Sequence, residues 1–302
     1  MNKNTISNES VDDLKKRLLN CNNEALVFPA VATEAIELTN DPSFSMAELA
    51  CLVERDPKLT TELLSLANSP LFAGSSPVSS IHQSIVRLGV KQCRNMILSV
   101  CVSGMMKKIS IDQEWMRSLL WRHSFTTASA CLYLNRTFGL GFQGEEFTAG
   151  LLHDIGRTLF AVVDIEKFEI ADSLNINEGK SQLARETEVF GIDHCEFGAW
   201  FATNNQLPES LVEVIRWHHE PSQENPHQKL IALVAASDQV ANQIHLLEEP
   251  TDYDPKENVA VGILSELYDR NFTDKFCEIA PQLVSDVRNM AGVDSDCEQK
   301  AV

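Results

Sequence analysis

Apolar residues recur at three- and four-residue spacing along most of the chain, which is the period of an amphipathic helix. The segment from Ala30 to Leu38 shows this spacing, and a longer apolar segment runs from Lys91 to about Lys107. Segments that alternate apolar and polar residues between hairpin turns, the usual sign of strands, are weak. The pattern therefore predicts an all-α protein of many helices, without internal repeats or low-complexity tracts.

Three short motifs predict where helices begin in the first third of the chain. Ser45-Met46-Ala47-Glu48 has the residues of a capping box, in which the serine and glutamate side chains bond each other's backbone N–H groups. Asp56-Pro57 combines an N-cap residue with proline at the first helical position. Ser80, followed by Ile81-His82-Gln83, indicates another capped start. We therefore expect helices that begin just after each of these caps.

The helical pattern is interrupted near residues 108–113, which separate two groups of helices. Because no long flexible linker lies there, the two groups are expected to pack together. We predict two packed helical subdomains, over residues 1–110 and 111–292, and a frayed acidic tail over residues 293–302.

Composition limits the partners of this chain. Its 302 residues include 25 basic and 43 acidic side chains, for a formal net charge of −18. Such a chain repels nucleic acid at long range, so bulk nucleic-acid binding is not expected, although a local basic patch would still admit a small phosphorylated ligand. The longest nearly apolar stretch, Met96 to Met106, is shorter than the ~20 residues that cross a bilayer. With no signal-peptide pattern at the N-terminus, the expected location is cytoplasmic, away from membranes.

The eight cysteines are scattered along the chain and form no CxxC pair. This spacing is not that of a disulfide framework or of a structural zinc site. Cys51, Cys101 and Cys131 lie in apolar helical stretches, and we predict that they are small buried side chains.

In the second half of the chain, polar residues inside apolar runs indicate where a functional site lies. His153-Asp154 lies in a Leu-Leu-His-Asp-Ile run, and Asp238 lies within the apolar segment Leu230 to Val240. Burial of an unpaired carboxylate costs several kcal/mol, so these acids need a cation or strong hydrogen-bond donors. A divalent metal ion meets this need, because imidazole and carboxylate are its ordinary ligands. On a helix, a His–Asp doublet can hold one ion jointly, or its Asp can bridge two.

Each of these residues also has an ordinary structural interpretation. Asp238 could accept hydrogen bonds from an arginine or a helix N-terminus, and His218-His219 could be a solvated helix C-terminus, where the dipole favours histidine. His123, after Trp121-Arg122, and His194, at an expected helix start, could be core or capping residues. The whole set in this order is much harder to obtain by chance.

The chain resembles the HDOD family of bacterial regulatory proteins, a branch of the HD superfamily, from about Phe28 to Val240. The resemblance implies an all-helical protein with an HDOD-specific N-terminal subdomain and an HD-like C-terminal subdomain. The segments that carry it are Phe28-Pro29-Ala30-Val31, Glu54-Arg55-Asp56-Pro57-Lys58-Leu59-Thr60, Leu66-Ala67-Asn68-Ser69, Pro77-Val78-Ser79-Ser80-Ile81, Ile85-Val86-Arg87-Leu88-Gly89, Trp121-Arg122-His123-Ser124, Gly150-Leu151-Leu152-His153-Asp154-Ile155-Gly156, Gly191-Ile192-Asp193-His194 and Trp217-His218-His219.

The resemblance also implies one or two bound divalent metal ions, with iron, manganese, zinc, nickel and magnesium all left open. Active HD phosphohydrolases use a His, His-Asp, Asp pattern, and two-metal members add histidines between the doublet and the last Asp. The catalytic candidates are Asp154, as a bridging ligand, and Arg157, which lies one turn further along the chain. Arg157 would neutralise a phosphate, unless it is a charge on the surface of a helix. The matching metal ligands here are His123, His153, Asp154, His194, His218, His219 and Asp238, of which His218 and His219 are alternatives for one place.

Three functions fit this resemblance. The first is a signal-transduction module that binds a regulatory protein partner or a small phosphorylated ligand. The second is a metal-dependent phosphohydrolase acting on a phosphate ester or nucleotide, and the third is a di-iron oxygenase. HD-GYP proteins, which hydrolyse cyclic-di-GMP, carry a Gly-Tyr-Pro motif after the second histidine pair. Here Pro221-Ser222-Gln223 follows instead, which argues against that substrate, and a separate receiver or cyclase domain is not expected.

Overall fold

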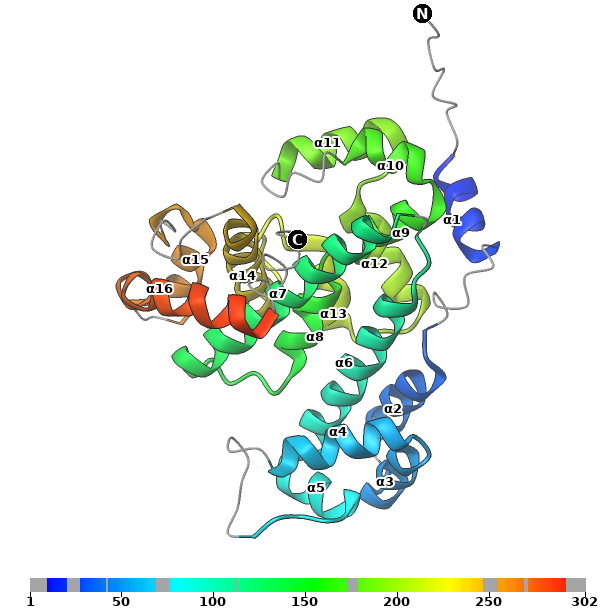
Figure 1. Ribbon diagram of the computed structural model, residues 1–302, viewed down its shortest axis with the longest axis vertical. Helices are drawn as coiled ribbons and strands as arrows, with labels where there is room; N and C mark the ends of the chain where they lie inside the picture. The colour runs from blue at the N-terminus through cyan, green and yellow to red at the C-terminus, as the bar shows by residue number, and fades with distance from the viewer. Residues whose placement is uncertain are drawn as a thin grey trace, which may run out of the picture.

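The computed structural model describes residues 10–20, 28–41, 43–68, 76–111, 113–172, 179–246, 255–268 and 271–291. Within these ranges the chain is helical and contains no strand, so the all-α prediction is confirmed (Figure 1). The helices are α1 (Val11–Asn20), α2 (Ala30–Asn40), α3 (Met46–Glu54), α4 (Pro57–Asn68), α5 (Ile81–Leu88), α6 (Val90–Lys108), α7 (Glu114–Phe138), α8 (Glu145–Leu152), α9 (Ile155–Val163), α10 (Ile165–Ala171), α11 (Gly179–Phe190), α12 (His194–Asn204), α13 (Glu209–Trp217), α14 (Gln228–Leu246), the 3₁₀ helix η3 (Pro255–Glu257), α15 (Val259–Leu267) and α16 (Phe272–Ala291).

The three predicted caps begin helices at the expected positions. The Ser45 side chain accepts a hydrogen bond from the Glu48 N–H, and the Glu48 carboxylate accepts from the Ser45 N–H, which is a complete capping box. Asp56 Oδ1 accepts from the N–H groups in the first turn of α4, at 2.8 and 3.3 Å. Ser80 accepts from the Gln83 N–H at the start of α5. Local hydrogen bonding therefore fixes these helix starts.

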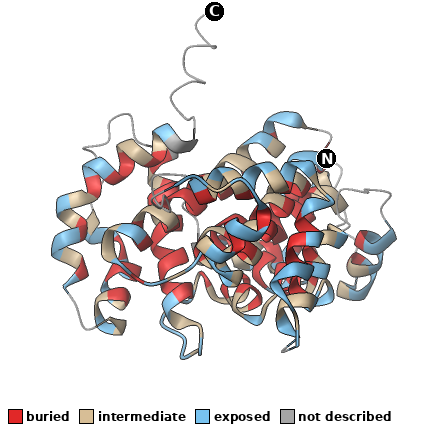
Figure 2. Ribbon diagram, turned by 90° about the horizontal axis from the view of Figure 1, so that it is seen from below, coloured by how far each residue is buried: buried red, intermediate tan, exposed pale blue. Residues whose placement is uncertain are grey.

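The helices form two packed groups (Figure 1). Helices α2 to α5 form one group, which packs on α6, and α6 in turn packs on α8 in the second group. Helix α7 lies at the centre of the second group, in contact with α8, α14 and α16. Figure 2 shows the buried residues on the inward faces of the helices. The connection between α6 and α7 falls in the predicted interruption at residues 108–113.

Helix α1 packs on α9, in the second group, rather than on α2 to α5. Arg17 donates to the Val163 carbonyl at 2.7 Å and pairs with Asp164 at 3.3 Å. The division of the chain at residue 110 stays a prediction. The contact between α1 and α9 joins a helix before that boundary to a helix after it. The predicted tail, residues 293–302, lies outside the described residues.

The apolar stretch of α6 serves internal packing. Ile97, Leu98, Val102 and Met105 are buried, and the helix contacts α2, α4, α5 and α8. In the part of the chain that the structure describes, no helix has the length and apolar character needed to span a bilayer.

The cysteine prediction holds for Cys101 and Cys131, which are buried free thiols. It is wrong for Cys51, which is exposed. Helix α3 turns Leu49, Leu52 and Val53 toward the core, and Cys51 lies on its opposite face. Apolar neighbours in the sequence therefore did not determine the burial of this position.

Candidate metal centre

Five separate helical segments bring the predicted ligands together. The contributing elements pack on one another, because α7 contacts α8 and α14, and α13 contacts α8, α12 and α14. All seven side chains are buried except that of His219, which is half-buried. They are His123 from α7, His153 and Asp154 between α8 and α9, His194 at the start of α12, His218 and His219 just after α13, and Asp238 from α14.

The His153-Asp154 doublet lies in a two-residue break between α8 and α9, not within one helix as the sequence suggested. Asp154 has φ −102° and ψ 18°, in the bridge region that active-site residues often occupy. This conformation interrupts the regular helical backbone between α8 and α9. It lets the Asp154 carboxylate project into the centre with one oxygen toward each of two groups of side chains.

The first group consists of His123, His153 and Asp238 around Asp154 Oδ2. His123 Nε2 lies 3.1 Å from Asp238 Oδ1 and 3.4 Å from Asp154 Oδ2. His153 Nε2 lies 3.5 and 3.6 Å from the same two oxygens, and the two ring nitrogens are 3.3 Å apart. Ligands bonded to one ion at about 2.1 Å are about 3.0–3.4 Å from one another. His123, His153 and Asp238 therefore have the spacing of a metal site, and Asp154 Oδ2 lies beside the two ring nitrogens.

The second group lies on the other side of the same carboxylate. Asp154 Oδ1 is 3.3 Å from His194 Nε2 and 3.4 Å from His218 Nε2, and these two nitrogens are 3.5 Å apart. The His219 ring packs beside both, with centroid distances of 4.2 Å to His218 and 5.2 Å to His194. Of the two alternatives, His218 is thus the one in contact with Asp154, and His219 lies beside it.

Cys195 joins this second group, although the sequence pattern did not indicate it as a ligand. Its buried Sγ lies within ligand-sharing distance of the nitrogens of His194, His218 and His219. Burial raises the pKa of the Cys195 thiol to about 11. Its position directly after His194 was the available signal, but a lone cysteine without a partner thiol does not point to a metal site.

Backbone and carboxylate acceptors set the tautomers of three histidines. His153 Nδ1 donates to the Gly150 carbonyl at 2.8 Å, and His218 Nδ1 donates to the Ile215 carbonyl at 3.0 Å. His194 Nδ1 donates to Glu186 at 2.7 Å, and the same Glu186 oxygen accepts from the His194 backbone N–H at 2.8 Å. With Nδ1 engaged in this way, Nε2 is the nitrogen that each ring presents inward, which is how metal-ligating histidines are usually held.

Arg157 is a buried partner of Asp154, so its interpretation as a surface charge is wrong. The side chain is 5% exposed, and Nη1 donates to Asp154 Oδ2 at 2.8 Å. Its Nε and Nη2 donate to the two oxygens of Asp172, at 2.8 and 3.2 Å. With its guanidinium held between two carboxylates, Arg157 orients Asp154 and does not face the entrance to the centre.

A continuous hydrogen-bond chain links the two sides of the centre behind the ligands. Gln182 Nε2 donates to Asp172 and to Glu186, at 3.0 Å in each case. The chain thus runs from Asp154 through Arg157, Asp172, Gln182 and Glu186 to His194. Asp154–Arg157 and Gln182–Glu186 are local pairs three and four residues apart, whereas Asp172 is brought to Arg157 and to Gln182 by the fold.

The carboxylates of the centre are held in their charged form. Burial opposes this, but His153, Arg157 and hydrogen bonds from His123 and His194 hold the pKa of Asp154 well below its usual value. Hydrogen bonds from His123 and His153 lower the pKa of Asp238 in the same way. Burial would lower the pKa of His123, yet hydrogen bonds to Asp154 and Asp238 raise it to about 9. The centre is a buried anionic site that attracts protons or a metal cation.

Close approach of α9 and α12 depends on Gly156. A Cβ atom at this position would lie 2.0 Å from the carbonyl oxygen of His194, so the helices could not keep their present separation. This contact sets the distance between the His153-Asp154 break and the start of α12. It explains why a glycine follows the doublet so closely.

Substitution Gly156→Ala is expected to lower the free energy of unfolding by about 1–3 kcal/mol, because α9 and α12 must move apart to admit the methyl group. Urea unfolding followed by circular dichroism measures the change. Gly104→Ala is the matched control, since Gly104 lies within α6 and a Cβ there meets nothing within 4 Å. Equal stability of the two variants would contradict the packing role of Gly156.

A cavity of about 460 Å³ opens beside the second group of ligands. It lies between the end of α13 and helices α14 and α15, and His218, His219 and Asp238 form part of its wall. Gln239 and Ser222 add neutral polar groups, Glu220 adds a carboxylate, and Ala235, Val259 and Ile263 are among the apolar members of the wall. The candidate centre is therefore reached from a pocket large enough for a small organic molecule.

Solved structures with the same fold come from several bacteria. An HDOD domain protein of unknown function from Geobacter sulfurreducens is 24% identical with a TM-score of 0.65, covering 92% of this chain and 99% of its own. A proposed metal-dependent phosphohydrolase from Shewanella amazonensis SB2B is 17% identical with a TM-score of 0.59, covering 93% and 97%. A proposed signal transduction protein from Marinobacter aquaeolei VT8 is 18% identical with a TM-score of 0.54, covering 95% and 68%.

Sequence comparison gives the family. An uncharacterised protein from Treponema pallidum (strain Nichols) is 25% identical over 228 residues, which make up 75% of this chain. This chain spans 43% of the length of that relative. The HDOD domain matches residues 26–221, about two thirds of the sequence. Through this match, the protein belongs to the HDOD domain family.

Proposed function

We propose that this centre binds two divalent metal ions bridged by Asp154 and hydrolyses a phosphate ester. The division of ligands around that single carboxylate carries the proposal. Oδ2 faces His123 and His153, together with Asp238, and Oδ1 faces His194 and His218. If Asp154 had only a structural role, one set of hydrogen-bond donors would be enough to hold its carboxylate. Separate sets of histidines at its two oxygens suit a pair of ions.

The protein side chains account for binding and orientation in this proposal. Bound ions would supply an activated water and charge stabilisation on the phosphoryl oxygens. Asp154 holds the two positions at a fixed separation, and Arg157 fixes the plane of its carboxylate through the 2.8 Å hydrogen bond. His219 and Cys195 complete the donors near His194 and His218. Gln239 and Ser222, which line the adjoining cavity, would contact the organic part of the ester.

A regulatory module is the second candidate, as the family resemblance implies. The solved structure of a proposed signal transduction protein with this fold favours it. In that case the metal would be structural, and the helical surface would bind a regulatory protein or a small phosphorylated ligand. The grouped candidate ligands and the adjoining cavity support the hydrolase over this module, since a purely structural ion needs no open approach.

The test combines metal analysis with hydrolysis assays on the full chain. Protein purified without chelators is expected to contain up to two transition-metal ions per chain by inductively coupled plasma mass spectrometry. It is expected to hydrolyse at least one member of a panel of phosphomonoesters, nucleotides and cyclic dinucleotides. EDTA should abolish hydrolysis and added Mn²⁺ should restore it. Metal-free protein under these conditions would defeat the proposal, and metal-loaded protein inert toward the panel would favour the regulatory module.

A further inference from the structure

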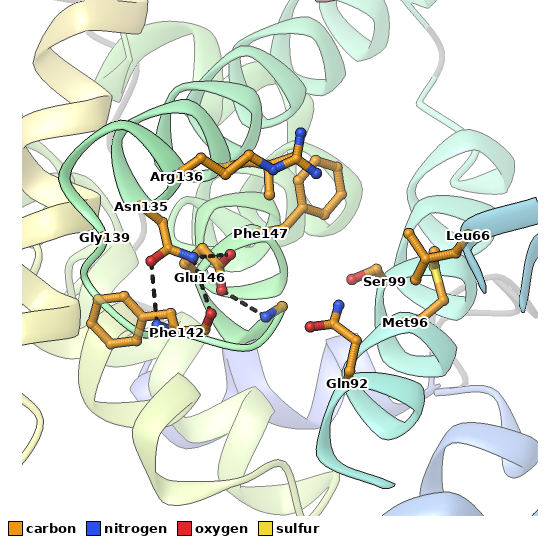
Figure 3. A pocket seen from close by; sticks show the side chains of 12 residues that line it. Leu66, Gln92, Met96, Ser99, Asn135, Arg136, Gly139, Phe142, Glu146 and Phe147 are labelled. Carbon is orange, nitrogen blue, oxygen red and sulfur yellow. Dashed lines mark hydrogen bonds between the residues drawn. The ribbon is translucent and has the colours of Figure 1, made fainter. Parts of the chain in front are cut away.

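A second cavity, of about 440 Å³, lies between the two groups of helices and away from the metal centre. Its wall comes from α4, α6, α7, α8 and the connection between α7 and α8 (Figure 3). The wall is mainly apolar, and none of the seven candidate metal ligands belongs to it. Its apolar members are Leu66, Met96, Leu132, Phe142 and Phe147.

One carboxylate belongs to this wall, that of Glu146, whose residue is only 1% exposed. Glu146 Oε1 accepts a hydrogen bond from Asn135 Nδ2 at 2.7 Å, and Oε2 accepts from the Gly144 N–H at 2.8 Å. Figure 3 shows both bonds, with the carboxylate at the centre of the wall. Both donors are neutral, and among the described residues no basic side chain forms an ion pair with Glu146.

Burial without a positive partner is costly for a carboxylate. Burial accordingly raises the pKa of Glu146, and hydrogen bonds from its own backbone N–H, from Asn135 and from the Gly144 N–H only partly oppose this. The bond to Gly144 explains how the side chain is oriented at the start of α8, but it leaves the negative charge uncompensated. Arg136 also belongs to the wall, yet it is exposed and extends toward Phe147 rather than toward the carboxylate (Figure 3).

The surroundings of Glu146 favour a cation over other occupants. The rings of Phe142 and Phe147 line the same cavity, and aromatic faces attract organic cations. Each carboxylate oxygen accepts one protein hydrogen bond and has capacity for another. The net charge of −18 also raises the local concentration of cations and lowers that of anions.

We propose that this cavity is a binding site for a small organic cation, with an ammonium or amidinium group at Glu146 and an apolar body against Met96, Phe142 and Phe147. The site is independent of the proposed hydrolase centre. It lies at the N-terminal end of α8, whereas the His153-Asp154 break follows the C-terminal end of the same helix.

The test measures binding of phenethylammonium to the full chain by isothermal titration calorimetry, with neutral 2-phenylethanol and anionic phenylacetate as matched probes. We expect the cation to bind about 10- to 100-fold more tightly than the alcohol, the range for a hydrogen bond to a charged group. Glu146→Gln should remove this preference. Equal affinity for cation and alcohol, or an unchanged preference in the variant, would overturn the proposal.

Two further measurements separate this site from the metal centre and from effects on folding. Affinity for phenethylammonium should be unchanged by EDTA and by Asp154→Ala; loss of binding in both would place the cation at the metal centre and overturn the assignment. Met96→Trp should abolish binding by filling the cavity, even if Glu146→Gln proves unstable. Full binding by a folded Met96→Trp protein would also overturn it.

Discussion

Substitution Asp154→Ala is expected to remove both metal ions and to reduce kcat/KM for phosphate ester hydrolysis by about a thousandfold or more. Its two oxygens face separate groups of histidines, at 3.3 to 3.6 Å, so one side chain supports both ion positions. Metal content by mass spectrometry and initial rates on the substrate found in the panel measure the effect.

Two single-position variants make this expectation sharper. Asp238→Ala removes a donor from the group of His123 and His153 alone, and His218→Ala removes one from the other group. Each is expected to keep about one ion, whereas Asp154→Ala keeps none. Asp12→Ala is the control, because Asp12 is an exposed acid on α1. Retention of two ions by Asp154→Ala would refute the bridging role.

Substitution Arg157→Met is expected to lower the free energy of unfolding by about 3–5 kcal/mol. The guanidinium is buried between Asp154 and Asp172, and its loss leaves two buried carboxylates without their cationic partner. Urea unfolding of metal-free protein measures the change. Bound metal is expected to reduce the loss, because the ions would neutralise Asp154.

Arg55→Met is the matched control for this loss. Arg55 pairs with Glu34 at 2.9 Å, but the two side chains are 63% and 47% exposed, so the loss should stay below about 1 kcal/mol. The double variant Arg157→Met with Asp172→Asn should recover part of the stability, since one buried charge is removed with its partner. Similar losses in Arg157→Met and Arg55→Met would show that Arg157 does not hold the centre.

The parts of this fold that depend on neighbouring residues were predictable from the sequence. Ser45, Asp56 and Ser80 begin helices because their own side chains bond N–H groups two or three residues further on. The candidate ligands were found for a related reason. Charged or imidazole groups inside apolar runs need partners, whatever the details of the fold.

The parts that depend on distant segments were not predictable in this way. Arg157 looked like a surface charge because its partner Asp172 lies in another segment, at the end of α10. Glu186 supports His194 from α11, and no local pattern indicates that contact. The break at Asp154 was also missed, because its sequence contains no proline and the close contact of Gly156 with His194 is visible only in three dimensions.

The position of Asp238 on α14 has a consequence for the smallest fragment that can work. Residues 26–221, the region shared with the HDOD family, end before this helix and begin after α1. Excision at those limits would delete Asp238, whose Oδ1 lies 3.1 Å from His123 Nε2, and uncover the side of α7 that α14 covers. A fragment cut at the limits of the family match would therefore lack both a candidate metal ligand and part of the packing around α7.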